Sequence, residues 1–393
     1  MATVYFISRI LSEAPAGNEN RTVMLERAGV GREKILLKEI PAVGLGLLME
    51  GDFACIAKRK LKKANSDPVA KAQILRNNLY RGILINRYRP PEDTQVDYVK
   101  ELFSYHVNVG HGNCSILTIK DLNNRLRIWM IDCSNFDWLN KKSYQGNLDA
   151  CIQHIRNRYD LDGFQIDKFF LTHLHHDHYS GIPYLLNSHY FHAGTEFWVN
   201  LHYSWSSPIL NSIIGRIVGL GSPVVEPVTL NSSGSINLWH PDQTIARTAT
   251  SRYRTPAVRI VPHVNDSSVV FNFKFGDTAI VFPGDIETTG WRHVTRCYPN
   301  LDSAQYYCVS HHGSDNGHQR TCHHGRVIKN ASQCRADLNR AILMGRDGAY
   351  RGVYHSNVIR DWGNTLIMSE GLAGKPPCQF LEIDLIKNMA VHH

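Results

Sequence analysis

The first feature that can do chemistry is a cluster of histidines and an aspartate near the middle of the chain. Four imidazoles and a carboxylate fall within the six residues 173–178, directly after an apolar run, and the motif is formed by His173, His175, Asp177 and His178. A loop at the end of a strand can aim several side chains at one point, so His173 and His175 can bind one cation and Asp177 with His178 a second. Such ligands suit zinc, manganese or iron better than magnesium or calcium. The spacing favours a metal site over a histidine-rich surface loop.

Two later apolar runs also end in metal-ligand residue types. Asp285 follows the run 278–282 and a Pro-Gly turn, where its two carboxylate oxygens can bridge two cations. His311 and His312 follow the run 305–309. We expect His311, the first of the pair at the strand end, to be the ligand. His312 is then expected to point elsewhere, toward a ligand residue or the substrate.

The elements that must position these residues alternate along the chain. Residues 147–157 have a helical pattern, and short apolar runs predict strands at 114–119, 127–132, 164–171, 267–273, 278–282 and 305–309. Alternating strands and helices with polar clusters at strand ends indicate a layered domain, α/β or α+β.

Together these residues resemble a known family. Thr172 to His178 resembles the signature of the metallo-β-lactamase fold superfamily. The resemblance implies an α+β fold, an αββα sandwich with ligands in loops at one edge, preceded here by a small N-terminal basic region. It also implies that Asp132 orients the ligand loop, that Asp285 is the bridging aspartate and that His311 is the last metal histidine.

A narrower resemblance is to the hydrolase domain of ComEC-type DNA-uptake proteins, and it covers about residues 103–370. Asn108 and Asn113 stand where that subgroup has aspartates. The similar segments are 108–114, 265–270, 283–287, 310–314, and 342–345 followed by Tyr354 and His355.

The superfamily's middle histidine ligand has no clear counterpart in this chain. Asn265, twenty residues before Asp285, stands in the place that the subgroup would give it. His263 and His240 are alternatives that the sequence leaves open. One cation is therefore expected to have fewer protein ligands and more water.

The ligand set implies a metal-dependent hydrolase with two divalent cations, zinc or manganese. The expected nucleophile is a hydroxide that bridges the cations. Asp177 is expected to hold both a cation and this hydroxide. His355, if the chain brings it to the site, can give a proton to the leaving oxygen.

Charge and histidine divide the chain into two parts. Residues 1–100 hold 17 lysines and arginines against 11 acids, which is +6 of the net +8, and none of the 21 histidines. The basic stretch 58–63 precedes a predicted helix at 68–79. We therefore predict a docking or nucleic-acid-binding region at 1–100 and the hydrolase domain at 101–393.

The prediction of the substrate rests first on the resemblance to ComEC-type hydrolase domains and second on the distribution of charge. We expect a phosphodiesterase or nuclease, and the alternatives are a hydrolase of a small phosphodiester such as a cyclic nucleotide, or an effector subunit that a protein partner docks through residues 1–100. Arginines just before Asn265 can clamp phosphate at the pocket rim, although a solvated face is as good an interpretation. They are Arg247, Arg252, Arg254 and Arg259.

The composition also limits the cellular compartments in which we expect the protein. No apolar run is long enough for a membrane span, and the first residues are too short and polar for a signal peptide. Nine scattered cysteines without a C-x-x-C pair favour buried free thiols over a disulfide framework. We therefore expect a cytoplasmic protein.

Overall fold

The computed structural model describes most of the chain after residue 88 and separate segments before it. The described residues are 2–12, 20–27, 34–41, 53–57, 88–92, 95–96, 98–201, 208–248, 264–297, 304–318, 320–323, 326–330, 339–350, 352–370 and 377–393. By their contacts, residues 1–88 with 205–223 form one unit, and residues 89–204 with 224–393 form another. The assignment of separate roles to residues 1–100 and 101–393 stays a prediction.

The first unit contains an antiparallel sheet of four strands in the order β3-β2-β1-β4. The strands are β1 (Ala2–Ser12), β2 (Asn20–Arg27), β3 (Lys34–Pro41) and β4 (Phe53–Ala57), and helix α8 (Pro208–Gly219) belongs to the same unit. In β3, Leu37 is buried while its neighbour Leu36 is exposed, which is the alternation of a sheet with one covered face. The basic stretch 58–63 and the helix predicted at 68–79 lie outside the described residues.

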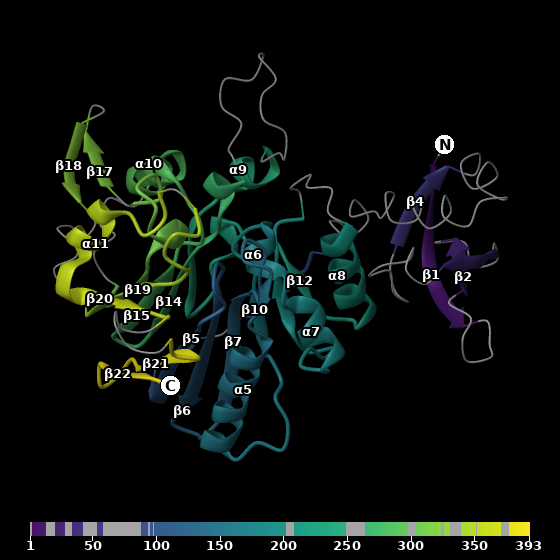
Figure 1. Cartoon of the computed structure of the whole chain (residues 1–393), viewed down its shortest axis with the longest axis horizontal. Coiled ribbons are helices and arrows are strands. Elements are labelled where there is room, and N and C mark those ends of the chain that lie inside the picture. Colours follow the sequence, from purple (N-terminus) through teal and green to yellow (C-terminus); the bar gives the residue numbers. More distant parts are fainter. Residues whose placement is uncertain are drawn as a thin grey trace. The chain divides into compact units, whose positions relative to one another are not determined.

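The second unit is built on two sheets (Figure 1). The first sheet has eight strands in the order β12-β11-β10-β7-β6-β5-β21-β22, parallel from β12 to β7 and antiparallel beyond. Its strands are β5 (Val99–Val107), β6 (Cys114–Asp121), β7 (Leu126–Cys133), β10 (Lys168–Phe170), β11 (Glu196–Trp198), β12 (Val224–Val225), β21 (Phe380–Asp384) and β22 (Met389–His392).

The second sheet has six strands in the order β13-β14-β15-β16-β19-β20. Its strands β15, β16, β19 and β20 run parallel to one another. The bounds are β13 (Ile236–His240), β14 (Val270–Phe275), β15 (Thr278–Phe282), β16 (Tyr306–Cys308), β19 (Arg340–Leu343) and β20 (Leu366–Met368). Smaller pairs are β8 (Phe136–Asp137) with β9 (Lys142–Ser143) and β17 (Arg320–His323) with β18 (Arg326–Asn330).

The main core lies between the two sheets. Trp129 and Phe170 of the first sheet pack edge-on and tilted against Phe273 of the second, with ring centroids 5.4 and 4.8 Å apart. Burying aromatic side chains between the facing sheets stabilises this unit. The two sheets are thereby fixed face to face.

Helices cover the outer faces of both sheets (Figure 1). Helix α5 (Gln145–Tyr159) buries Leu148 and Ile152 and contacts β5 and β21 of the first sheet. Helices α10 (Thr288–Cys297) and α11 (Ser356–Trp362) bring Trp291 and Trp362 into a second apolar cluster on the outer face of the other sheet. The remaining helices are α6 (His176–Tyr179), α7 (Ile182–Asn187) and α9 (Gln243–Thr248). The αββα sandwich that the sequence predicted is confirmed.

The polar clusters follow strand ends in both sheets. In the first sheet, β7 and β10 are parallel, so their carboxyl ends meet at one edge. In the second sheet, β15, β16 and β19 are parallel and do the same. The loops after these strands carry the residues singled out in the sequence.

Two features of the described residues concern apolar helices and cysteines. Within the described residues, no helix is both long and apolar enough to cross a bilayer. The five cysteines whose side chains the structure describes are buried with free thiols: Cys114, Cys133, Cys151, Cys308 and Cys378.

Candidate metal centre

The loop after β10 is anchored to the end of β7 by Asp132. The Asp132 carboxylate accepts hydrogen bonds from the Thr172 backbone N–H (2.8 Å) and hydroxyl (2.7 Å), and its Oδ2 lies 2.7 Å from His178 Nδ1. Asp132 is buried and has φ of 52°, a left-handed conformation that a branched residue would resist. Because its Nδ1 faces a carboxylate, His178 is turned so that Nε2 is free to bind a cation.

The turn before Asp285 requires glycine at position 284. Gly284 has φ of 56°, and a Cβ there would lie 2.8 Å from the Thr172 Cβ. The Asp285 backbone N–H donates to Ser268 Oγ at 3.1 Å. This close approach lets the turn after β15 sit directly against the histidine loop, which places Asp285 among the histidines.

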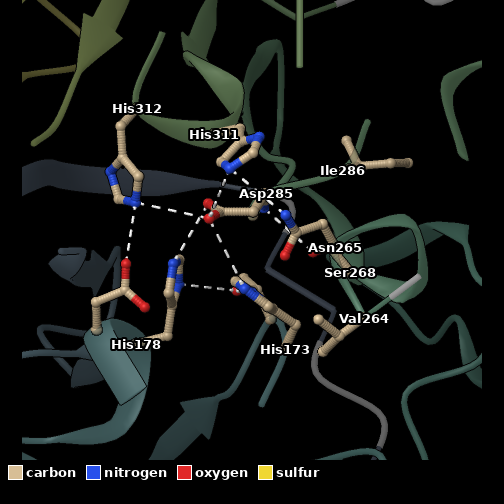
Figure 2. Close-up of polar contacts among 12 residues, drawn as sticks. His173, His178, Val264, Asn265, Ser268, Asp285, Ile286, His311 and His312 are labelled. Carbon is tan, nitrogen blue, oxygen red and sulfur yellow. Dashed lines mark hydrogen bonds and ion pairs between the residues drawn. The ribbon is translucent and has the colours of Figure 1, made fainter. Parts of the chain in front are cut away.

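Asp285 lies at the centre of the site, with histidines around it (Figure 2). One group of potential ligands comprises His173, His175 and Asp285, and the other comprises Asp177, His178, Asp285 and His312, with ligand atoms within 4.8 Å of one another in each group. His178 Nε2 is 3.3 Å from Asp285 Oδ1, and His173 Nε2 is 3.8 Å from Oδ2. Asp285 therefore belongs to both groups and can bridge two cations.

The buried atoms of this cluster fit cations as their partners. The nitrogens His173 Nε2, His178 Nε2 and His312 Nε2, together with Asp285 Oδ1, are buried and make no hydrogen bond to any part of the chain that the structure describes. Burying polar atoms without hydrogen bonds is costly, and two dications would satisfy all of them. Imidazole and carboxylate donors in this number suit a transition metal such as zinc or manganese.

His311 and His312 lie on different sides of the site. His312 Nε2 is 3.3 Å from Asp177 Oδ2 and 3.6 Å from Asp285 Oδ2, whereas His311 Nε2 is 3.9 Å from Asp285 Oδ2. Both residues have φ of 50°, so the backbone turns sharply at each and sends the adjacent rings to separate places. From the sequence we expected His311 to be the ligand and His312 to point elsewhere. In the structure His312 is the member of the pair that joins Asp177 and His178.

Asn265 lies on the side of the site occupied by His311. Its Nδ2 donates to Glu287 Oε1 at 2.8 Å and lies 3.4 Å from His311 Nε2. Glu287 Oε1 is in turn 3.5 Å from His311 Nδ1. Asn265, which has the sequence position expected for the missing histidine, thus lies beside His311, and Glu287 is a nearby residue that the sequence analysis did not single out.

Electrostatic interactions within the cluster favour ionised aspartates and two protonated histidines. Burial disfavours charge on Asp177 and Asp285, but the neighbouring imidazoles outweigh it and lower the pKa of both carboxyls. Burial likewise opposes charge on His178 and His312, yet the same carboxylates raise the pKa of both rings. Burial lowers the pKa of His173 well below its usual range. Without cations, protons on His178 and His312 therefore balance the two aspartates.

His111 is a buried histidine at the site to which the sequence analysis gave no role. Its Nε2 is 3.5 Å from Asp177 Oδ2, and its ring centroid is 4.3 Å from that of His312. Burial, followed by His312, lowers the pKa of His111 to about 3, so the ring is neutral. The signal in the sequence was the position of His111 between two glycines, Gly110 and Gly112. In the structure Gly112 has φ of 148°, and a Cβ there would lie 2.7 Å from the Asp177 carbonyl oxygen.

Other predicted residues are not brought to the ligand group. His355 starts helix α11, where its Nδ1 accepts the Asn357 N–H at 3.3 Å and lies 3.8 Å from Asp315 Oδ1. His240, one alternative for the middle histidine, bonds through Nε2 to the Asp266 carbonyl at 2.7 Å. The roles given to His263, Arg252 and Arg254 fall outside the described residues, and the proton-donor role of His355 stays a prediction.

A third group of ligand residue types lies elsewhere, at His154, Glu382 and His393. His154 Nε2 is 2.6 Å from Glu382 Oε2, and His393 Nε2 is 3.4 Å from it. Arg158 already pairs with the other oxygen of Glu382. The guanidinium supplies positive charge there, which disfavours a cation.

Replacing Asp132 with asparagine tests how the carboxylate positions His178. The amide keeps the shape of the side chain but removes the negative charge that faces His178 Nδ1, so we expect metal affinity to fall by about 10- to 100-fold. Competition with a fluorescent chelator measures it. Asp160→Asn, at an exposed left-handed residue that caps α5, is the control. Equal affinity for the Asp132→Asn protein and the wild type would contradict the positioning role.

Comparisons with known proteins give one partial sequence match and distant structural likenesses. The chain is 35% identical over 86 residues to a Ribonuclease Z of Enterococcus faecalis, and the match spans 22% of this chain and 23% of that relative. No family model matches the chain. A mutant of the CmlA β-hydroxylase has 14% identity and a TM-score of 0.38, covering 93% of this chain and 69% of that one. CmlA, a diiron β-hydroxylase from Streptomyces venezuelae, has 13% identity and a TM-score of 0.37 over the same shares.

The architecture and the site together resemble one known class of protein. Two facing sheets covered by helices carry, at the strand ends, the motif from His173 to His178 and the shared aspartate Asp285. These features resemble those of the metallo-β-lactamase fold superfamily.

Proposed function

We propose that this chain is a metal-dependent hydrolase of phosphodiester bonds in nucleic acid, with two divalent cations, zinc or manganese, as cofactors. The observation that carries the proposal is the position of Asp285, buried and shared by two groups of ligand side chains. His173 and His175 would hold one cation, and Asp177, His178 and His312 would hold the other. His311, 3.9 Å from Asp285, is the nearest further histidine for the first cation.

The residues around the cations have separate tasks. Bound dications supply Lewis acidity, which lowers the pKa of water and withdraws charge from phosphoryl oxygens. Asp177, ionised because the neighbouring imidazoles lower its pKa, accepts a hydrogen bond from the attacking water and orients it. His111, neutral and with Nε2 3.5 Å from Asp177 Oδ2, can direct its ring N–H at this carboxylate and so help to hold it in place.

Two likenesses support nucleic acid as the substrate. The name of the matched relative, Ribonuclease Z, refers to an enzyme acting on RNA. The segment 108–114 resembles the strand and turn of ComEC-type hydrolase domains, and here it closes over the site because the Asn113 N–H donates to the Asp177 carbonyl at 3.0 Å. Asn108, which replaces an aspartate of that subgroup, uses its amide to bond the Cys378 carbonyl at 2.9 Å, so it holds the loop as an aspartate could not.

The proposal is tested with purified protein loaded with zinc or manganese. We expect metal-dependent cleavage of bis-p-nitrophenyl phosphate and of labelled single-stranded DNA or RNA, and no hydrolysis of lactam or thioester substrates. His173→Ala is expected to remove the activity. Absence of phosphodiester cleavage with every metal, or activity that survives His173→Ala unchanged, would refute the proposal.

Metal affinity is expected to depend steeply on pH. His178 and His312 have raised pKa values and hold protons in the metal-free protein, but only a neutral imidazole can bind a cation. Raising the pH from 6 to 8 should therefore tighten binding, by about tenfold per pH unit for each proton displaced. Chelator competition across this range measures the slope. A pH-independent affinity, after correction for the chelator, would show that these rings are already neutral.

A further inference from the structure

Two strongly exposed aromatic side chains lie beside the metal centre. Among the described residues, only three aromatic side chains are more than about half exposed, and two of them, Trp138 and Tyr350, are each 56% exposed. Large exposed rings near a functional site are typical of ligand-binding surfaces. Each of the two is also held in place by contact with a histidine of the site.

Trp138 packs against His176, the residue between the ligands His175 and Asp177. The ring centroids are 4.6 Å apart and nearly perpendicular, and Trp138 Nε1–H donates to His176 Nε2 at 3.1 Å. Phe136 packs against the same indole with centroids 5.0 Å apart. With its N–H bonded and two edge-on contacts, the indole is held in place while more than half of it stays open to solvent.

Tyr350 reaches the site through His111. The two ring centroids are 5.0 Å apart in a T-shaped contact, and His111 Nε2 is itself 3.5 Å from Asp177 Oδ2. One residue therefore separates each ring from Asp177. Trp138 contacts His176, the residue before Asp177 in the chain, and Tyr350 contacts His111, which lies beside Asp177 in space.

An arginine lies beside these rings. Asp137, the residue before Trp138, accepts hydrogen bonds at Oδ2 from the His111 N–H (3.1 Å) and from Arg346 Nε (2.9 Å). The side chain of Arg346 is 30% exposed. One buried carboxylate thus ties the Trp138 turn, the His111 loop and a partly exposed cation together next to the metal centre.

We propose that Trp138 and Tyr350 are base-stacking surfaces on the two approaches to Asp177, so that the site takes single-stranded nucleic acid; this rests on the proposed function. Bases of a single strand have free faces that stack on aromatic rings, and Arg346 attracts the backbone phosphates. A duplex keeps its bases stacked on one another. A cyclic nucleotide has one base and can occupy only one of the two rings.

The test compares a single-stranded oligonucleotide with an abasic oligomer of the same length and charge. We expect Trp138→Ala and Tyr350→Ala each to lower the wild type's preference for the oligonucleotide, in kcat/KM and in Kd, by about tenfold. Trp138→Phe and Tyr350→Phe should keep most of the preference, since a ring remains. Leu122→Ala, at a residue 64% exposed elsewhere, is the control that should leave it unchanged.

The outcomes separate the stacking proposal from the proposed function. An unchanged preference in both alanine variants, an equal loss on the abasic oligomer, or cleavage that favours duplex or cyclic nucleotide would overturn the stacking surfaces even if phosphodiesters are cleaved. If no phosphodiester is cleaved, the proposed function fails. Oligonucleotide affinity, measured by fluorescence anisotropy, then still decides the stacking proposal, because it does not need turnover.

Discussion

Asp285→Asn is expected to remove nearly all activity and to lower the metal content of the purified protein from about two cations per chain to one or fewer. Asp285 is the one described side chain shared by both ligand groups, and its Oδ1 is a buried acceptor without a hydrogen bond in the described part of the chain. An amide offers one neutral oxygen in place of a bridging carboxylate. Losing a residue that only supports a ligand already costs about 10- to 100-fold, so the loss here should exceed that range.

Elemental analysis after gel filtration measures the metal, and initial rates on bis-p-nitrophenyl phosphate measure the activity. Asp277→Asn is the matched control, because Asp277 is exposed in the turn that joins β14 to β15, the hairpin that leads to Asp285. A variant Asp285→Asn that retains two cations and wild-type rates would show that Asp285 does not bridge.

His312→Ala and His311→Ala are expected to differ strongly although the residues are adjacent. His312 Nε2 is buried and within 3.6 Å of both Asp177 and Asp285, so its loss should empty the second cation site and lower activity by more than about 100-fold. His311 lies farther from Asp285 and is paired with Asn265 and Glu287. The loss of His311 should weaken binding of the first cation by about tenfold and leave the second cation bound.

Each variant is the control for the other, since both remove one imidazole from the same turn. Metal stoichiometry from elemental analysis, with a titration of activity against added zinc or manganese, distinguishes them. A larger effect of His311→Ala on metal content would support the assignment that the sequence favoured. Equal effects would mean that the turn, and not either ring, is needed.

The fold could be predicted from the sequence, and so could much of the candidate ligand set, because the signals are local. Residues 173–178 are contiguous, so their spacing alone brings four potential ligands to one loop after β10: His173, His175, Asp177 and His178. The alternation of short apolar runs with helices predicted a layered α/β or α+β domain, and the resemblance of residues 172–178 to the metallo-β-lactamase fold superfamily implied the αββα sandwich. The aspartate after β15 was recognisable by its Gly-Asp turn at a strand end.

Only the tertiary structure could separate neighbours whose roles depend on direction. His311 and His312 are equivalent in sequence, and the positive φ at both decides which ring turns toward Asp177. His111 and Glu287 come from other loops, and a single sequence does not show that those loops meet His312 and His311. The His355 side chain, free in the sequence to reach the site, instead caps its own helix.

The chain by itself therefore determined which residue types can bind metal and at which strand ends they stand. The packing of two sheets decided which of them meet, because residues far apart in sequence converge only when the carboxyl ends of β7, β10, β15 and β16 come together. The exposed rings of Trp138 and Tyr350 make the same point. Their aromatic character is visible in the sequence, but their contact with His176 and His111 exists only in the folded chain.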